Sequence, residues 1–147
     1  MTEADEQALA ERVVADMMAK DAFSQWLGID VVDIRPNGAT VRMTVREEMV
    51  NGFGVCHGGI AFSLADSALA FASNTHGRLT VSIENSITYP KAISPGDVLV
   101  ARAEEESATN RLAFFRVTVR RADEEIVALF RGTVYKTHKA LFQSLND

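Results

Sequence analysis

Residues 51–77, NGFGVCHGGIAFSLADSALAFASNTHG, combine an apolar helix pattern with a single carboxylate. Residues 60–73 are apolar almost all round, and with the preceding glycines the predicted helix spans residues 58–76, with Gly77 placed to end it. Asp66 sits in the middle of this helix. Because an unpaired buried charge is costly, this carboxylate indicates either a role in chemistry or a buried structural hydrogen-bond network.

The rest of the chain predicts a sheet around this helix. Residues 1–27 predict two N-terminal helices, the second ended by Gly28. Two β-branched runs joined by the turn RPNG predict a hairpin, and four alternating runs predict further antiparallel strands at residues 79–89, 97–107, 111–121 and 125–136. The tail from Thr137 is expected to fray. We therefore predict one α+β domain over residues 1–147, with five or six curved antiparallel strands wrapped around one long apolar helix.

Composition limits the function classes. The chain has 147 residues and a net charge of −5, which argues against a nucleic-acid-binding surface. The acidic first residues lack the basic start of a signal peptide, and no run is long enough to span a bilayer. We expect a cytoplasmic protein that binds neither nucleic acid nor membrane. A single cysteine with three scattered histidines does not make a metal site, and no cofactor is expected.

The start of the predicted helix could bind an anion. His57 precedes Gly58 and Gly59, and free N–H groups at a helix start can hold an oxygen that gains negative charge. Asp66 could supply a general base or a nucleophile. Gly59 and Asp66 are seven residues apart, or roughly 10 Å along a helix, which is too far for both to act on one carbonyl group. The spacing predicts a dimer whose two sites are shared across a two-fold axis, unless an N–H elsewhere in the chain is the donor.

The sequence resembles a known enzyme family. The run NGFGVCHGGIAFSLADSALAFA is similar to the signature of hotdog-fold thioesterases of the PaaI, or phenylacetic-acid-degradation, type. That signature has an asparagine, a G-x-x-H-G-G run and a helix with A-D-[ST]-A in this spacing. The segments WLGIDVVDI and ALFRG also look like this group, so the resemblance covers most of the chain. It implies the hotdog fold, dimers that often pair into tetramers, and hydrolysis of acyl-CoA thioesters without metal or redox cofactor.

The resemblance also implies roles for single residues. It makes Asp66 the catalytic carboxylate and the Gly59 N–H the donor to the thioester oxygen. The residues expected to act in or line the catalytic site are Asn51, His57, Gly59 and Asp66. The residues expected to contact substrate are Phe53, Gly58, Ser67 and Lys91. Lys91 stands in a segment where relatives often carry arginine, which makes it the candidate contact for the CoA phosphates.

Three functions follow from this resemblance. The first is an acyl-CoA thioesterase for aryl or medium-chain groups, in which Asp66 either attacks the thioester carbonyl or activates the attacking water. The alternatives are a non-catalytic acyl-CoA-binding module and a hotdog dehydratase, although the proline-rich approach to the helix typical of dehydratases is missing. Aromatic and bulky residues of the helix region favour an aryl pocket, and these are Phe53, Phe62, Leu64, Leu69 and Phe71. Cys56 has no orienting third group and is not expected to be a nucleophile.

Overall fold

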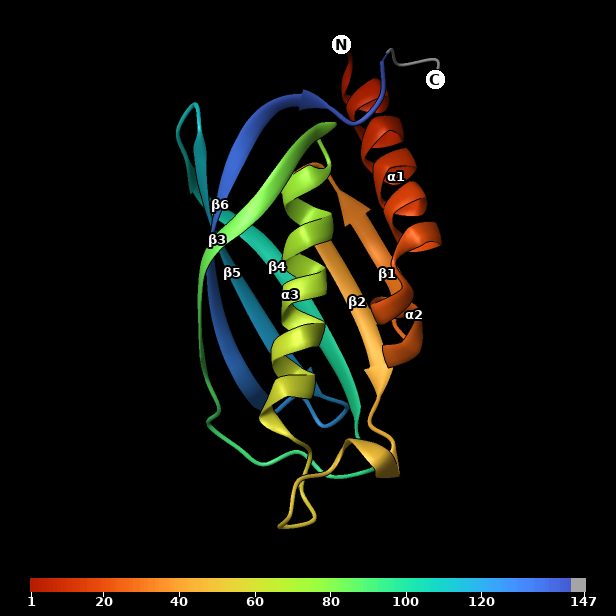
Figure 1. Cartoon of the computed structure of the whole chain (residues 1–147), viewed down its shortest axis with the longest axis vertical. Coiled ribbons are helices and arrows are strands. Elements are labelled where there is room, and N and C mark those ends of the chain that lie inside the picture. Colours follow the sequence, from red (N-terminus) through yellow and green to blue (C-terminus); the bar gives the residue numbers. More distant parts are fainter. Residues whose placement is uncertain (144–147) are drawn as a thin grey trace.

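The apolar run forms the central helix of the molecule. The computed structural model describes residues 1–143 and places helix α3, Gly58–Asn74, at the centre (Figure 1). Its start agrees with the prediction, and it ends two residues earlier than predicted because the Asn74 side chain turns the chain. The Asn74 amide nitrogen donates to the carbonyl oxygens of Ala70 and Thr80, at 2.8 and 3.1 Å. Gly77 follows with a φ of 88°, which favours glycine.

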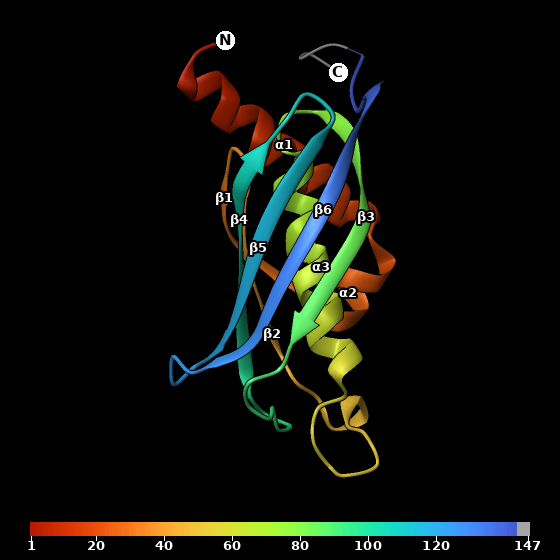
Figure 2. The same ribbon diagram turned by 90° about the vertical axis from the view of Figure 1, so that its left-hand side faces the viewer.

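The alternating runs form a six-stranded antiparallel sheet, as the sequence predicted. Its order is β1-β2-β4-β5-β6-β3, so β1 and β3 are the edge strands (Figure 2). A short 3-10 turn, Glu47–Met49, follows the first hairpin. The strands are β1 Asp30–Arg35, β2 Gly38–Thr44, β3 Arg78–Thr88, β4 Val98–Ala108, β5 Leu112–Arg121 and β6 Ile126–Ala140.

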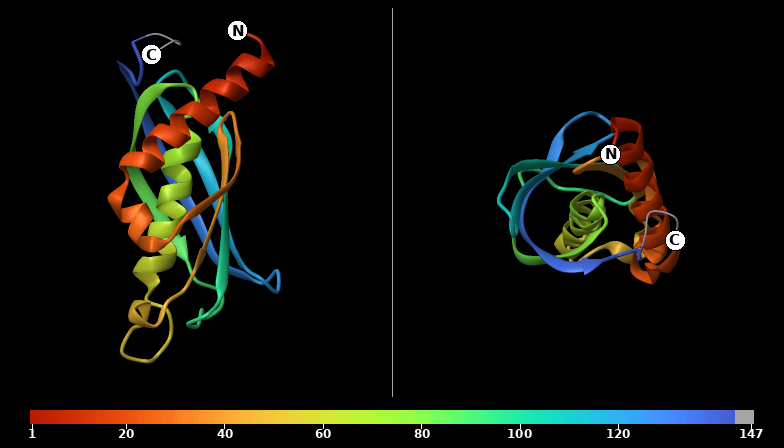
Figure 3. Two further views of the ribbon diagram at one scale, coloured as in Figure 1. Left: turned by 90° about the vertical axis from the view of Figure 1, so that its right-hand side faces the viewer. Right: turned by 90° about the horizontal axis from the view of Figure 1, so that it is seen from above.

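The sheet curves around α3 and buries it. Seen from above, the strands enclose the helix on most sides (Figure 3). Alternate side chains of the inner strands face the helix, as Leu99, Ala101 and Ala103 of β4 do with at most 1% exposure. Apolar burial stabilises by roughly 25 cal/mol per Å², so a helix that is apolar all round gains most when it is enclosed.

The N-terminal helices cover the side of α3 that the sheet leaves open. Helix α1, Glu3–Lys20, contacts both β1 and α3 and buries Val13 and Val14 there (Figure 3). Helix α2, Ala22–Leu27, ends at Gly28, whose φ of 78° is left-handed. Both helices were predicted. No helix within residues 1–143 is long and apolar enough to cross a membrane.

The last strand is longer than the sequence predicted. We expected fraying from Thr137, but β6 continues to Ala140. The Thr137 hydroxyl donates to the carbonyl oxygen of Leu79 at 2.6 Å, and the Arg78 side chain donates to the carbonyl oxygen of Thr137 at 3.1 Å. These polar contacts with β3 hold a segment that has little apolar pattern of its own. The predicted tail beyond residue 143 lies outside the described residues.

Candidate active site

Asp66 lies half-buried in the middle of α3, on the face toward β3. The Nδ2 atom of Asn85, on β3, donates a hydrogen bond to its Oδ1 atom at 3.4 Å. Burial raises the pKa of Asp66; the Asn85 bond lowers it, and the nearby Asp21 carboxylate raises it further. Among residues 1–143 no cation forms an ion pair with Asp66. The charged form of Asp66 is therefore less stabilised than the charged form of a carboxylate in a salt bridge. A carboxylate in this state is suited to act as a base or a nucleophile.

The N-terminal helices reach the site through a chain of hydroxyl groups. Asp21 caps α2 by accepting the Ser24 N–H at 2.9 Å and the Ser24 hydroxyl at 2.6 Å. The Ser24 and Ser67 hydroxyl oxygens are 2.8 Å apart, and both side chains are buried. Ser67 therefore ties α3 to α2, and its expected substrate contact stays a prediction.

The start of α3 is held by two side chains. His57 is the N-cap, and its Nδ1 atom accepts the Gly59 N–H at 2.9 Å. The Tyr89 hydroxyl donates to the carbonyl oxygen of Gly58 at 2.8 Å. A Cβ at Gly58 would lie 3.0 Å from the Tyr89 hydroxyl oxygen, so the glycine gives the tyrosine room. The two glycines thus serve the geometry of the helix start, and their substrate roles stay predictions.

The loop before α3 is organised by Asn51. Its Oδ1 atom accepts the N–H groups of Phe53 and Val55, at 2.8 and 3.4 Å. The side chain of Phe53 is 93% exposed at the tip of this loop. The structure brings Asn51 and His57 to the same loop, and their contact with substrate stays a prediction.

Cys56 is in the wrong state for a nucleophile. Its side chain is buried, and burial, followed by the nearby Asp97 carboxylate, raises the pKa of the thiol to about 11. Since the thiolate is the nucleophilic form, the thiol is inert near neutral pH. Cys56 packs in the hydrophobic core, which agrees with the expectation that it is not a nucleophile.

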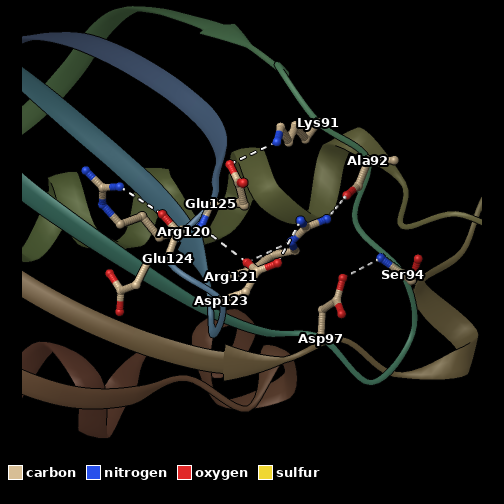
Figure 4. A network of polar contacts seen from close by, with 9 residues as sticks. All are labelled: Lys91, Ala92, Ser94, Asp97, Arg120, Arg121, Asp123, Glu124 and Glu125. Carbon is tan, nitrogen blue, oxygen red and sulfur yellow. Dashed lines mark hydrogen bonds and ion pairs between the residues drawn. The ribbon is translucent and has the colours of Figure 1, made fainter.

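Lys91 lies in a network of charged groups at the β5–β6 turn. Its amine is 2.9 Å from a carboxylate oxygen of Glu125, and Arg121 pairs with Asp123 at the same turn (Figure 4). Arg121 also donates to the carbonyl oxygen of Ala92 at 3.1 Å, which anchors the segment that carries Lys91. A CoA phosphate would have to compete with Glu125, and the proposed phosphate contact stays a prediction.

The expected aryl pocket needs correction. Leu64, Leu69 and Phe71 have at most 1% exposure and belong to the hydrophobic core, because the curved sheet covers the face of α3 that carries them. Phe62 is only partly buried and packs edge-on against Phe130, with ring centroids 5.3 Å apart. A groove of about 640 Å³ between α1, α2 and β1 is lined by none of the residues predicted for the site.

Three residues around the site were missed from the sequence. Asp21 and Asn85 act on Asp66, and Tyr89 holds the start of α3. Tyr89 had a weak signal as an aromatic residue directly after a strand. Asn85 was visible only as a polar residue inside a strand pattern, and Asp21 as an ordinary helix cap, so pairing either with Asp66 required the fold.

The sequence of this chain matches a known protein superfamily. Residues 53–128 match the family model of the Thioesterase superfamily. The chain belongs to this superfamily. It therefore has the hotdog fold and is a thioester hydrolase, in agreement with the sequence-based resemblance.

Three relatives illustrate the similarity. A putative esterase of Archaeoglobus fulgidus is 40% identical over 92% of this chain and 88% of its own length. The acyl-coenzyme A thioesterase PaaI of Escherichia coli is 36% identical over 84% of this chain and 86% of its own length. The structure of E. coli PaaI, from the phenylacetic acid degradation operon, superposes with a TM-score of 0.89 over 91% of this chain and 97% of that one. A Streptococcus mutans protein bound to acetyl CoA has a TM-score of 0.73 and 27% identity over 76% of this chain and 90% of that one.

Proposed function

We propose that the protein hydrolyses acyl-CoA thioesters that carry an aryl or medium-chain acyl group. The observation that carries this proposal is Asp66, a half-buried carboxylate with a raised pKa that accepts a side-chain hydrogen bond from Asn85. It stands on the helix of a thioesterase-superfamily fold. The E. coli relative is named an acyl-coenzyme A thioesterase, and the S. mutans relative was solved with acetyl CoA.

The chemistry assigns Asp66 one of two roles. As a general base it would take a proton from water while the water oxygen bonds to the thioester carbonyl carbon. As a nucleophile it would form a mixed anhydride, which water then hydrolyses. In both cases the C–S bond breaks, CoA leaves as a thiolate and the acyl group is released as the free acid. A thiolate is a good leaving group because a thiol has a lower pKa than an alcohol.

The Gly59 N–H is the proposed donor to the thioester oxygen. In the free protein His57 occupies this N–H, so substrate binding would require the imidazole to rotate away. His57 is exposed, which leaves room for that rotation. The helix dipole then adds to the stabilisation of the oxyanion at this end of α3.

A second copy of the chain would complete the site. Gly59 and Asp66 are seven positions apart on α3, as the sequence indicated, so one copy of the helix does not bring both to the same carbonyl group. The edge strand β3 carries Val81 and Ile83, which are 45% and 58% exposed. Pairing of β3 with its copy would cover these side chains and bring the two α3 helices near one another in opposite directions. A further pairing into tetramers and a cytoplasmic location stay predictions.

Release of free thiol from phenylacetyl-CoA, followed with a thiol reagent, tests this function. We expect turnover by the intact protein that is lost in the Asp66→Asn variant. Binding of the CoA thioester without thiol release would contradict the proposal and favour the acyl-CoA-binding module.

A further inference from the structure

A short chain of side-chain hydrogen bonds ends at Asp66. The Ser82 hydroxyl donates to Oδ1 of Asn85 at 2.8 Å, and Nδ2 of Asn85 donates to Oδ1 of Asp66 at 3.4 Å. A carboxylate can only accept, so the amide must turn its NH₂ group toward Asp66 and its oxygen toward Ser82. The serine hydroxyl therefore fixes the amide in the orientation that Asp66 needs.

An irregularity in β3 makes this chain possible. In a regular strand, residues three apart point to opposite faces of the sheet. The pairing of β3 with β6 shifts between Ser82 and Glu84, with Ser82 opposite Val134 and Glu84 opposite Thr133. The extra residue of such a bulge turns the strand, so that the Ser82 and Asn85 side chains meet.

The neighbouring strand leaves space for the amide. Gly132 of β6 lies directly opposite Asn85 in the sheet. A Cβ at Gly132 would lie 2.8 Å from Oδ1 of Asn85 and 2.5 Å from Cδ2 of Leu69, and side chains do not approach that closely. The bulge, the glycine and the serine thus all serve the placement of one amide group beside Asp66.

We propose that Asn85 is a positioning residue for the thioesterase reaction, which holds Oδ1 of Asp66 and leaves Oδ2 as the reacting oxygen. The inference rests on the proposed function of Asp66. The 3.4 Å separation is long for a hydrogen bond, and such bonds often tighten when substrate binds. Holding one oxygen limits rotation of the carboxylate and so presents the other in a constant direction.

The same contact acts on the proton equilibrium of Asp66. The Asn85 bond stabilises the carboxylate and lowers its pKa, against the rise caused by burial and by Asp21. In the described part of the chain, Asp21 is the charged side chain that influences Asp66; Ser24 and Ser67 at the α2 contact are uncharged, and Gly132 has no side chain. Loss of the Asn85 donor should therefore move the acidic limb of the kcat/KM profile to higher pH. Loss of the Asp21 charge should move it to lower pH.

The test compares Asn85→Leu, Asp21→Asn and Asp66→Asn with the unchanged protein, using phenylacetyl-CoA over a range of pH. Asn110→Leu, in the exposed turn between β4 and β5, is the matched control for the substitution. We expect Asn85→Leu to lower kcat about ten- to a hundredfold, which is less than the roughly 10²–10⁴-fold contributed by a group that itself transfers the proton, with KM little changed. The acidic limb of the kcat/KM profile should move to higher pH in Asn85→Leu and to lower pH in Asp21→Asn.

Two further results keep the inference separate from the proposed function. Ser82→Ala keeps the Asn85 side chain and removes only its anchor. It should move the acidic limb of the kcat/KM profile to higher pH, by less than Asn85→Leu does. This variant tests the inference even if Asn85→Leu folds poorly. If Asp66→Asn is inactive and Asn85→Leu keeps the kcat and the pH profile of the unchanged protein, Asn85 has no positioning role. The assignment of Asp66 would still stand. An active Asp66→Asn overturns the assignment of Asp66 and, with it, this inference.

Discussion

The Nδ1 atom of His57 accepts the Gly59 N–H at 2.9 Å, so the helix end proposed to bind the substrate oxygen is capped by its own neighbour. The imidazole satisfies one of the backbone donors that a helix start leaves without a partner. In the free protein this contact stabilises α3. During the reaction the thioester oxygen would take the place of the imidazole nitrogen.

Replacement of His57 should reveal the capping contribution. His57→Ala removes the acceptor and should lower the free energy of unfolding by about 1 kcal/mol, the usual value of an N-cap. His57→Asn supplies a good capping side chain and should restore most of that loss. Urea unfolding at one fixed protein concentration measures both variants. Equal stability of all three proteins would show that the contact does not stabilise α3.

Replacement of Asp66 should stop the reaction without unfolding the protein. Asp66→Asn keeps the size of the side chain and removes the charge, so kcat should fall by about 10²–10⁴-fold. Cys56→Ala is the matched control in the same region, and its kcat should stay within about twofold because the raised thiol pKa leaves little thiolate. A silent Asp66→Asn together with an inactive Cys56→Ala would reverse the two assignments.

The stability of the Asp66→Asn variant should depend on pH. The pKa of Asp66 is raised in the folded protein above its ordinary value of 3.8, so the folded state binds more protons than the unfolded state as pH rises past that value. Ionisation of Asp66 therefore lowers the free energy of unfolding of the wild type with rising pH, and the asparagine variant escapes this loss. Its Tm should exceed that of the wild type at pH 7, and the difference should shrink toward pH 4. A Tm difference that does not change over this range would mean that the carboxylate is not perturbed.

The limits of the sequence are clear around this carboxylate. The spacing of apolar residues in the sequence predicted the six strands and three α-helices, because such patterns depend only on neighbouring residues. The partner of Asp66 is 19 residues away and depends on a strand bulge, which leaves no periodic signal. The Lys91–Glu125 pair depends in the same way on two loops meeting at one end of the sheet. The resemblance located Asp66 and its helix, whereas the packing around them required coordinates.

Substitution on the edge strand should test the shared site. Ile83→Lys places like charges across the proposed two-fold axis and should halve the mass measured by light scattering during size exclusion. Val32→Lys is the matched control, because Val32 is 58% exposed, as Ile83 is, but lies on β1 at the other edge. It should leave the β3 contact intact. A wild-type monomer that is active at the working concentration would contradict the shared-site arrangement.

The acyl preference should favour phenylacetyl-CoA over palmitoyl-CoA. Phe62 precedes Asp66 by four residues on α3, so the two side chains lie on the same face of the helix, one turn apart. Its ring is partly buried against Phe130, which fixes it, and a fixed ring packs well against an aryl group.

The measurement is kcat/KM for phenylacetyl-, hydroxyphenylacetyl-, hexanoyl- and palmitoyl-CoA under one set of conditions. Phe62→Leu should reduce the ratio of phenylacetyl- to hexanoyl-CoA by about tenfold, since such contacts discriminate by roughly 1–3 kcal/mol. Phe114→Leu, which replaces an exposed aromatic ring on β5, is the control and should leave this ratio unchanged. If palmitoyl-CoA is the best substrate, the ring beside Asp66 does not limit the length of the acyl chain, and the aryl preference is wrong. The assignment of thioester hydrolysis would still stand.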